Sequence, residues 1–303
     1  MNPQRATPRL ANIRLHPIKA LDAVPVNEAR IGPNGGLELD RVWALYSTDG
    51  RWVNAKRTAA IHVVRAAYAP DLSSVTLTVP GDRRDIPAMT FAFPGDTEGA
   101  AEWFSMYFEQ LIQVRYTPEG FPDDGLAPGP TIVSTASLEA VCEWFPGMSL
   151  DEARRRFLAT LEIDGASSAA ADGSNGFDLT SGGNGSVDSA VKSDSSRAPE
   201  KLPAFWEDQL FGEREATVVR FKIGDVAFEG SNPCARCPVP ARESQTGINN
   251  DGFQKHFIDM RRAKLPPWAP VERFDHFYRL STNTRVPSTE QGKRLRVGDA
   301  LKL

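Results

Sequence analysis

Short alternations of apolar and polar residues recur along the chain and predict a protein made mainly of β-strands. Two of them open the sequence at residues 10–18 and 24–32, and Pro17 and Pro25 interrupt their extended pattern. Residues 41–46 combine alternation with aromatic and β-branched side chains, which favour strands. Further strands are expected at residues 51–56, 61–69, 75–79, 216–223, 225–230, 276–286 and 292–303.

Four stretches have the apolar spacing of amphipathic helices instead. These helices are expected within residues 99–113, 131–145, 149–157 and 253–263. The second stretch begins as a strand, and Ser134 or Ser137 is available as the N-cap of the helix that follows. Many short strands, few helices and strong turn chemistry predict an α+β fold that is mostly β, built from β-barrel modules with helices packed outside them.

The segment at about residues 166–200 departs from this pattern, because it consists largely of Ser, Gly, Ala, Asn and Asp. It offers almost nothing to bury and cannot offset its ordering entropy, so we expect a disordered surface insertion. The stretches on either side, residues 158–165 and 205–212, both resemble core pieces of one unit. We therefore expect the insertion to lie within a domain rather than between two domains.

Composition and charge exclude several classes of protein. Hydrophobic residues make up 41% of the 303 residues, which is enough for a sizeable core and for two domains. The net charge of −4 argues against a nucleic-acid partner, and no apolar run reaches the ~20 residues of a membrane helix. The start of the chain lacks the apolar core of a secretory signal, and only three cysteines occur. Free thiols, a cytoplasmic location and no membrane association are therefore expected.

Residues 230–247, GSNPCARCPVPARESQTG, are the most informative stretch, since glycine and prolines bracket two thiols and an arginine. A closed structural zinc site needs four ligands, and neither Cys142 nor the four scattered histidines provide a second pair. A redox dithiol normally opens a helix, whereas prolines follow Cys237 here. The third possibility is a metal cofactor held by one thiolate, with the other thiol and Arg236 in support. Spacing alone does not choose among the three.

The same stretch resembles the Cys-x-Arg-Cys…Thr-Gly signature of MOSC domains, the modules named for the C-terminal part of molybdenum cofactor sulfurase. The start of the chain resembles the β-barrel domain that precedes MOSC in the mitochondrial amidoxime-reducing components and their bacterial relatives. The matching residues there are His16, Pro17, Ile18, Lys19, Ala20, Gly36, Leu37, Asp40, Arg41 and Trp43. Residues 205–212 match a third family segment loosely, and all three segments occur in the family's order.

The resemblance implies two domains: an N-terminal β-barrel of the MOSC type at residues 8–118 and a MOSC β-barrel with peripheral helices at residues 119–303. It also implies a molybdenum cofactor (Mo-molybdopterin), in which a pterin dithiolene and one protein cysteine hold the metal. By match that cysteine is Cys237, with Cys234 as the alternative. Arg236 would neutralise the anionic metal–sulfur core. Pyridoxal phosphate is not expected.

The cofactor-binding residues that the resemblance implies are Lys19, Arg41, Arg156, Thr160, Arg236 and Cys234. Lys19 and Arg41 would hold the pterin phosphate, which suits a point-charge ammonium and a forked guanidinium. Two departures weaken the match. Ala20 stands where the family has a serine, and the family's Arg-x-Arg-Pro-Asn strand is reduced to Arg156 as a basic contact and Thr160 as a hydroxyl.

Without the resemblance, several of these residues have simpler interpretations. Lys19 would be a solvated side chain, and Asp40 with Arg41 would be a surface ion pair of small energy. His16 would pack at the end of a strand, and the arginines at residues 154–156 would form a solvated helix face. The six tryptophans are interpreted as core anchors.

The resemblance implies an oxidoreductase that removes oxygen from N-oxygenated or similar small substrates. A separate electron-transfer partner is then expected, because the chain has no ferredoxin-type set of cysteines. The alternative is a non-catalytic carrier or binding protein for the cofactor or for sulfur, which the lost serine and asparagine favour. A scaffold that keeps the fold without the cofactor is a third possibility.

Overall fold

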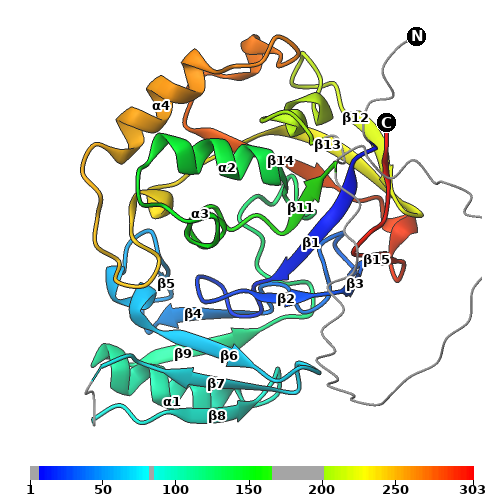
Figure 1. Cartoon of the computed structure of the whole chain (residues 1–303). Coiled ribbons are helices and arrows are strands. Elements are labelled where there is room, and N and C mark those ends of the chain that lie inside the picture. Colours follow the sequence, from blue (N-terminus) through cyan, green and yellow to red (C-terminus); the bar gives the residue numbers. More distant parts are fainter. Residues whose placement is uncertain (1–6, 82–84, 166–200) are drawn as a thin grey trace, which may run out of the picture.

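The computed structural model describes residues 7–81, 85–165 and 201–303 (Figure 1). Over these residues the fold is rich in strands and has four α-helices, which confirms the expectation of a mostly β protein. The strands are β1 (Arg9–Leu15), β2 (Val24–Val26), β3 (Glu28–Arg30), β4 (Trp43–Ser47), β5 (Trp52–Val53), β6 (Arg65–Tyr68), β7 (Ser74–Thr78), β8 (Met89–Ala92), β9 (Ile112–Tyr116), β10 (Ile132–Ser134), β11 (Leu161–Asp164), β12 (Val219–Ile223), β13 (Val226–Ala235), β14 (Arg279–Arg285), β15 (Arg294–Arg296) and β16 (Leu301–Lys302). The α-helices are α1 (Thr97–Phe108), α2 (Thr135–Trp144), α3 (Leu150–Phe157) and α4 (Phe253–Ala263), and the 3₁₀ helices are η1 (Ala59–Val63), η2 (Trp206–Leu210), η3 (Val239–Ala241), η4 (Val271–Arg273) and η5 (Ser288–Glu290).

An eight-stranded sheet forms the larger part of the molecule, in the order β16-β12-β13-β14-β10-β11-β1-β2. Its neighbouring strands are antiparallel except β10 and β11, which run parallel. Backbone hydrogen bonds also join the start of β1 to the last strand of the chain: Leu10 N donates to Asp299 O at 2.8 Å, and Leu301 N donates to Pro8 O at 2.7 Å. The two ends of the described chain are thus held side by side.

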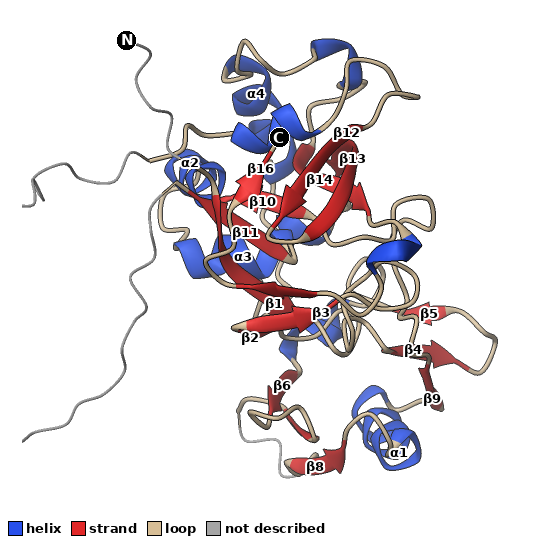
Figure 2. Cartoon of the chain, turned by 90° about the vertical axis from the view of Figure 1, so that its right-hand side faces the viewer, coloured by secondary structure: helices blue, strands red, loops and turns tan. Residues whose placement is uncertain are grey.

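Three smaller sheets have the orders β5-β4-β9, β6-β7-β8 and β15-β3. Figure 2 shows the first two, with α1, at one end of the molecule and the large sheet at the other. The sheets in the described residues do not close into complete barrels, although a bridge between Arg9 and Ala300 joins β1 to the end of the chain, so the expectation of two β-barrels holds only in part. The first strands pair far along the chain, β1 with β11 and β3 with β15. The domain boundary at residue 118 stays a prediction.

Local sequence signals explain most helix boundaries. Ser134 caps α2 by accepting a hydrogen bond from the backbone N–H of Ser137. Ser134 is one of the two N-cap residues predicted from the sequence. The helix predicted at residues 99–113 is too long, because Glu109 adopts a left-handed conformation (φ 52°) and ends α1. The chain then pairs with β4 from Ile112 onward as β9, so strand pairing overrides the helical pattern there.

Three apolar clusters fill the interior. One lies among the smaller sheets and α1, around the fully buried Trp43 and Trp103. The second lies against the large sheet, and the third packs α2, α3 and α4 together around Phe157 and Phe257. Within the described residues no helix is both long and apolar enough to cross a membrane. The insertion predicted at about residues 166–200 lies outside the described residues.

Candidate functional site

One wall of the site is made by two segments near the start of the chain. Lys19 N donates to Trp43 O at 2.8 Å, and Ile18 forms a parallel bridge with Trp43. Ile18 and Trp43 are fully buried, so this junction is anchored in the core. Ala20 and Arg41 both have positive φ (74° and 54°), which is uncommon outside glycine and turns the chain after each segment.

The opposite wall is the turn that carries the two thiols. Cys234 lies near the end of β13, where the pairing with β14 shifts register between Pro233 and Ala235 and bends the strand. Pro238 follows Cys237 and ends the extended run before η3. Both thiols are half-buried and free. The prolines therefore hold the two sulfur atoms on a short bent segment.

Arg236 lies between the thiols and anchors this turn. Its Nη1 donates to the sulfur of Cys234 at 3.1 Å, and its Nη2 donates to the carbonyl oxygen of Phe157. The backbone N–H of Arg236 donates to Tyr278 O at 2.9 Å. The described contacts thus give Cys234 a cationic partner.

Lys19 projects from the first wall with most of its surface covered. Its Nζ donates to Phe121 O at 2.7 Å, lies 3.0 Å from a carboxylate oxygen of Asp123, and lies 4.7 Å from the ring centre of Trp52. Burial lowers the pKa of Lys19, and Asp123 opposes that effect. The ammonium is therefore held by a carboxylate, a carbonyl and an aromatic face.

Arg41 is the second cation of this wall. Its Nη1 lies 3.7 Å from a carboxylate oxygen of Asp40. Burial alone would lower the pKa of Arg41, but Asp40, Asp123 and the sulfur of Cys234 outweigh it and raise the pKa. The sulfur of Cys234 is thus within electrostatic reach of Arg41, although more than 190 residues separate them in the sequence.

A cavity of about 600 Å³ lies between the two walls. The predicted site residues that line it are Lys19, Arg41, Cys234, Arg236 and Cys237. Other residues in its lining are Trp52, Asn54, Lys56, Asp123, Asp124, Asn232 and Asn283. The folded chain therefore brings two thiols and three of the predicted cations to one space.

A comparison with protein families matches the part of the chain that forms the first wall. Residues 7–110 match the family described as the MOSC N-terminal beta barrel domain. Residues 7–110 therefore carry a domain of this family. MOSC domains are associated with molybdenum cofactor binding, and the matched range carries Lys19 and Arg41. The search of curated proteins found no match to this chain.

Two predicted site residues lie outside the large cavity. Arg156 is 5% exposed, and its Nε donates to Glu152 at 2.6 Å, so it is held in an ion pair behind the wall. Thr160 is buried, and its hydroxyl has no hydrogen-bond partner among the residues described. Its backbone N–H donates to the hydroxyl of Thr131, which does line the cavity. The geometry therefore places Thr160 one residue behind the lining.

The simpler interpretations of the basic residues are also tested by the fold. The arginines at residues 154–156 do not form a solvated face, because each makes an ion pair and Arg156 is buried. His16 is 3% exposed, in agreement with a packing role, yet it lines the cavity as well. Asp40 and Arg41 are largely covered rather than on the surface.

Several residues that line the large cavity were not predicted from the sequence. Trp52 was interpreted as a core anchor, but it is only half-buried and forms part of the cavity wall. Asp123 and Asn283 carried no recognisable motif, because their positions depend on a loop and on the β13–β14 pairing. The Asp-Asp pair at residues 123–124 in a proline- and glycine-containing loop was the available signal.

Gly247, at the end of the cysteine motif, has a packing explanation. Gly247 has φ 73°, and a Cβ there would lie 2.5 Å from the carbonyl oxygen of Ala59 in η1. Only glycine therefore allows the loop to approach η1 this closely.

The described residues contain no group of three or more His, Cys, Asp or Glu side chains that could hold a metal ion. A site with one protein thiolate does not require such a group.

Proposed function

We propose that this protein binds a molybdenum cofactor in the cavity of about 600 Å³ and acts as an oxidoreductase on small N-oxygenated substrates. One observation carries the proposal. The lining of this cavity combines Cys234 and Cys237 with Lys19 and Arg41, which come from the opposite end of the chain.

The residues present fit such a cofactor in size and charge. The cavity volume lies within the ~300–1,000 Å³ typical of small-molecule sites. Thiolates are soft ligands suited to a transition metal, and basic side chains suit a phosphate. Arg236 Nε is buried and has no hydrogen-bond partner in the described part of the chain, so a donor remains for an anionic group.

Each residue would have a distinct part in binding. Cys237 would supply the metal thiolate, with Cys234 as the alternative. Lys19 and Arg41 would hold the phosphate of the pterin, and Arg236 would offset the negative charge near the sulfur atoms. When bound, a molybdenum cofactor supplies two-electron oxidation and reduction.

The proposed reaction removes an oxygen atom from nitrogen. It consumes two electrons and two protons and releases water, so it requires a reductant. With three cysteines the chain has too few for a ferredoxin-type cluster, and the electrons would come from a separate electron-transfer protein. The proposed partners are thus that protein and a small-molecule substrate.

A non-catalytic carrier of the cofactor, or of sulfur, is the second candidate. Ala20 lines the cavity where a serine would offer a hydroxyl, and Thr160 lies behind the lining. Fewer donors to the cofactor favour weaker retention and hence transfer to another protein. The two candidates share the binding site and differ in turnover.

Elemental analysis tests the binding step. The protein is expressed in a host that makes the cofactor, and molybdenum is measured per chain in wild type, Cys237→Ala and Cys234→Ala. We expect near-stoichiometric metal in wild type and its loss in Cys237→Ala. Cys142→Ala is the matched control, because Cys142 lies on α2 and does not line the cavity. Wild-type protein without molybdenum from such a host would refute the proposal.

Turnover then separates the two candidates. The metal-loaded protein is mixed with a chemical reductant and N-hydroxylated compounds, and loss of the oxygen atom is followed by product analysis. Reduction of the substrate supports the oxidoreductase. Transfer of the cofactor to an acceptor protein without substrate reduction supports the carrier.

A further inference from the structure

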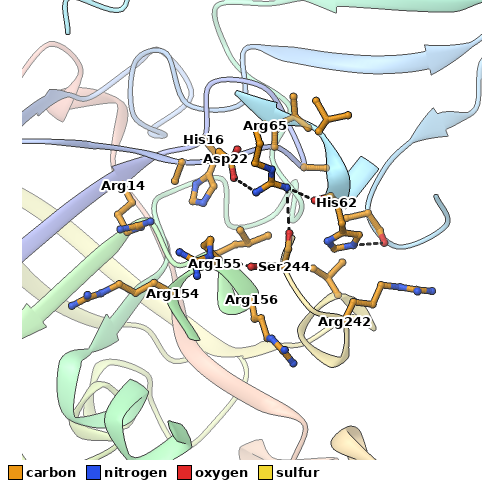
Figure 3. Close-up of a pocket in the computed structure, with 17 residues that line it drawn as sticks. Arg14, His16, Asp22, His62, Arg65, Arg154, Arg155, Arg156, Arg242 and Ser244 are labelled. Atoms are coloured by element: carbon orange, nitrogen blue, oxygen red, sulfur yellow. Dashed lines mark hydrogen bonds and ion pairs between the residues drawn. The ribbon is translucent and has the colours of Figure 1, made fainter. Parts of the chain in front are cut away.

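A second, smaller cavity adjoins the first, and six arginines are among the residues that line it (Figure 3). It offers about 40 Å³ to groups of the size of water. The residues that line both cavities are His16, Ala20, Ala55, Leu158 and Val239. The arginines in the wall of the smaller cavity are Arg14, Arg65, Arg154, Arg155, Arg156 and Arg242.

Carboxylates already neutralise several of these arginines. Arg65 lies 2.9 Å from Asp22, and Arg154 lies 2.8 Å from Glu162. The neutralised residues also include Arg156, whose partner is Glu152. In Figure 3 the head groups of Arg156 and Arg242 extend away from the group formed by Arg14, His16 and Arg155. These pairs therefore hold elements together rather than offer donors to the cavity.

Arg14 differs from its neighbours. It has no ion pair and no side-chain hydrogen bond within the described ranges, and its Nε is buried without a partner. Burial and the nearby positive charge of Arg154 lower the pKa of Arg14, so the guanidinium is held where a cation is unfavourable. An anion beside it would offset both effects.

Two further donors lie near Arg14. Arg155 uses Nε to donate to Ser244 at 3.0 Å and Nη2 to contact Glu152 at 3.2 Å, which leaves Nη1 without a bonded partner in the described structure. His16 is 3% exposed, and its Nε2 has no hydrogen-bond partner there. Its Nδ1 lies 3.8 Å from Asp40, beyond hydrogen-bonding distance. The buried, unpartnered Nε of Arg14 and Nε2 of His16 call for a hydrogen-bond partner, and Arg155 offers a further donor beside them.

We propose that Arg14, Arg155 and His16 bind a small tetrahedral oxyanion, with inorganic phosphate or sulfate as the class of ligand. The volume of about 40 Å³ holds about three water-sized groups, since each needs ~10–15 Å³. Guanidinium groups bind such oxygens through paired N–H donors. Arg14 and Arg155 line only the smaller cavity, whereas His16 lines both, so the proposal does not require the cofactor.

Calorimetry with inorganic phosphate tests the site. Phosphate is titrated into wild-type protein at constant ionic strength set with sodium chloride, and we expect saturable binding to one site per chain. Arg14→Gln should weaken binding by about tenfold or more, because it removes charge-assisted hydrogen bonds. Arg57→Gln changes the net charge equally at an exposed position and should leave the affinity unchanged. No saturable heat in wild type, or an equal loss in both variants, would overturn the proposal.

Two more variants make the test independent of the fold and of the thiol site. Ala23→Met keeps every charge but fills the cavity that Ala23 lines, and it should also abolish phosphate binding. Cys237→Ala should retain full phosphate affinity, whatever happens to its molybdenum. Thermal unfolding provides the second readout: phosphate should raise the Tm of wild type and Cys237→Ala, but not of Ala23→Met. Loss of the shift in Cys237→Ala would place the anion in the large cavity and overturn the proposal.

Discussion

Two ion pairs, one at each of the adjoining cavities, differ in exposure. At the larger cavity, Lys19 is paired with Asp123, whose side chain is 59% exposed. At the smaller cavity, Arg156 (5% exposed) is paired with Glu152 (18% exposed). Solvent screens an exposed pair, which can exchange its partner at low cost, whereas a buried pair is costly to break. Lys19 can therefore exchange its partner for a ligand, whereas Arg156 is committed to the structure.

The largest expected effect is on the buried pair. Glu152→Gln should lower the free energy of unfolding by about 3 kcal/mol, because it leaves the buried Arg156 without its counter-ion. Glu152 also accepts a hydrogen bond from the backbone N–H of Ser244 at 3.0 Å, which links α3 to the cysteine-bearing loop. Urea denaturation measures the change, with Glu102→Gln on the exposed face of α1 as control. A loss similar to that of the control would remove the contrast between the cavities.

The next effect concerns cofactor retention. Lys19→Gln should reduce bound molybdenum about tenfold under limiting cofactor, since a charge-assisted contact with phosphate is lost. The measurement is metal content per chain after gel filtration. Lys255→Gln, on the exposed face of α4, removes the same charge elsewhere and should retain the metal. Equal retention in the two variants would show that Lys19 does not hold the cofactor.

Removal of the exposed counter-ion should have little effect on stability. Asp123→Asn is expected to change the free energy of unfolding by less than about 1 kcal/mol, because the pair is screened by solvent. Metal content should be kept or increased, since Lys19 and Arg41 lose a competing anion. The same denaturation and metal measurements decide the matter. A loss as large as that in Glu152→Gln would show that both cavities use their ion pairs alike.

The smallest expected effect is on the pH dependence of the free energy of unfolding at acid pH. Burial alone would raise the pKa of Asp123, but Arg41 and Lys19 outweigh it and hold the pKa at about 2, against an ordinary 3.8. A depressed pKa gives stability that is present above pH 3.8 and is lost as the pH falls toward about 2. Solvent screening limits this contribution to less than about 1 kcal/mol. Thermal unfolding of wild type and Asp123→Asn over this range should show curves that converge at the acid end.

The sequence predicted individual elements better than their assembly. Alternation located β4 and β7, and the capping serine located the start of α2, since these signals are local. The β-barrels were predicted only in part, because the described sheets do not close completely and the pairing of β1 and β3 with strands more than 140 residues away was not foreseen. Such pairing depends on which edges meet in space, and periodicity carries no information about it.

The candidate site shows the same division. The cysteine motif and the family resemblance indicated Lys19, Arg41 and the thiols, and all of them line one cavity. Asp123 and the arrangement around Arg14 could not be predicted, because loop conformation and ion pairing decide which charges remain unpartnered. A sequence shows that arginines are present, but not which of them lacks a carboxylate.

Ala20 lines both cavities. Its backbone has a left-handed conformation (φ 74°), which glycine adopts freely and alanine does not. The strain is therefore already present in this chain. Serine at this position would add a hydroxyl beside the two cavities without additional backbone strain. Glycine would remove the backbone strain at this turn. The side chain at position 20 thus affects the polarity of both cavities and the flexibility of the segment that carries Lys19.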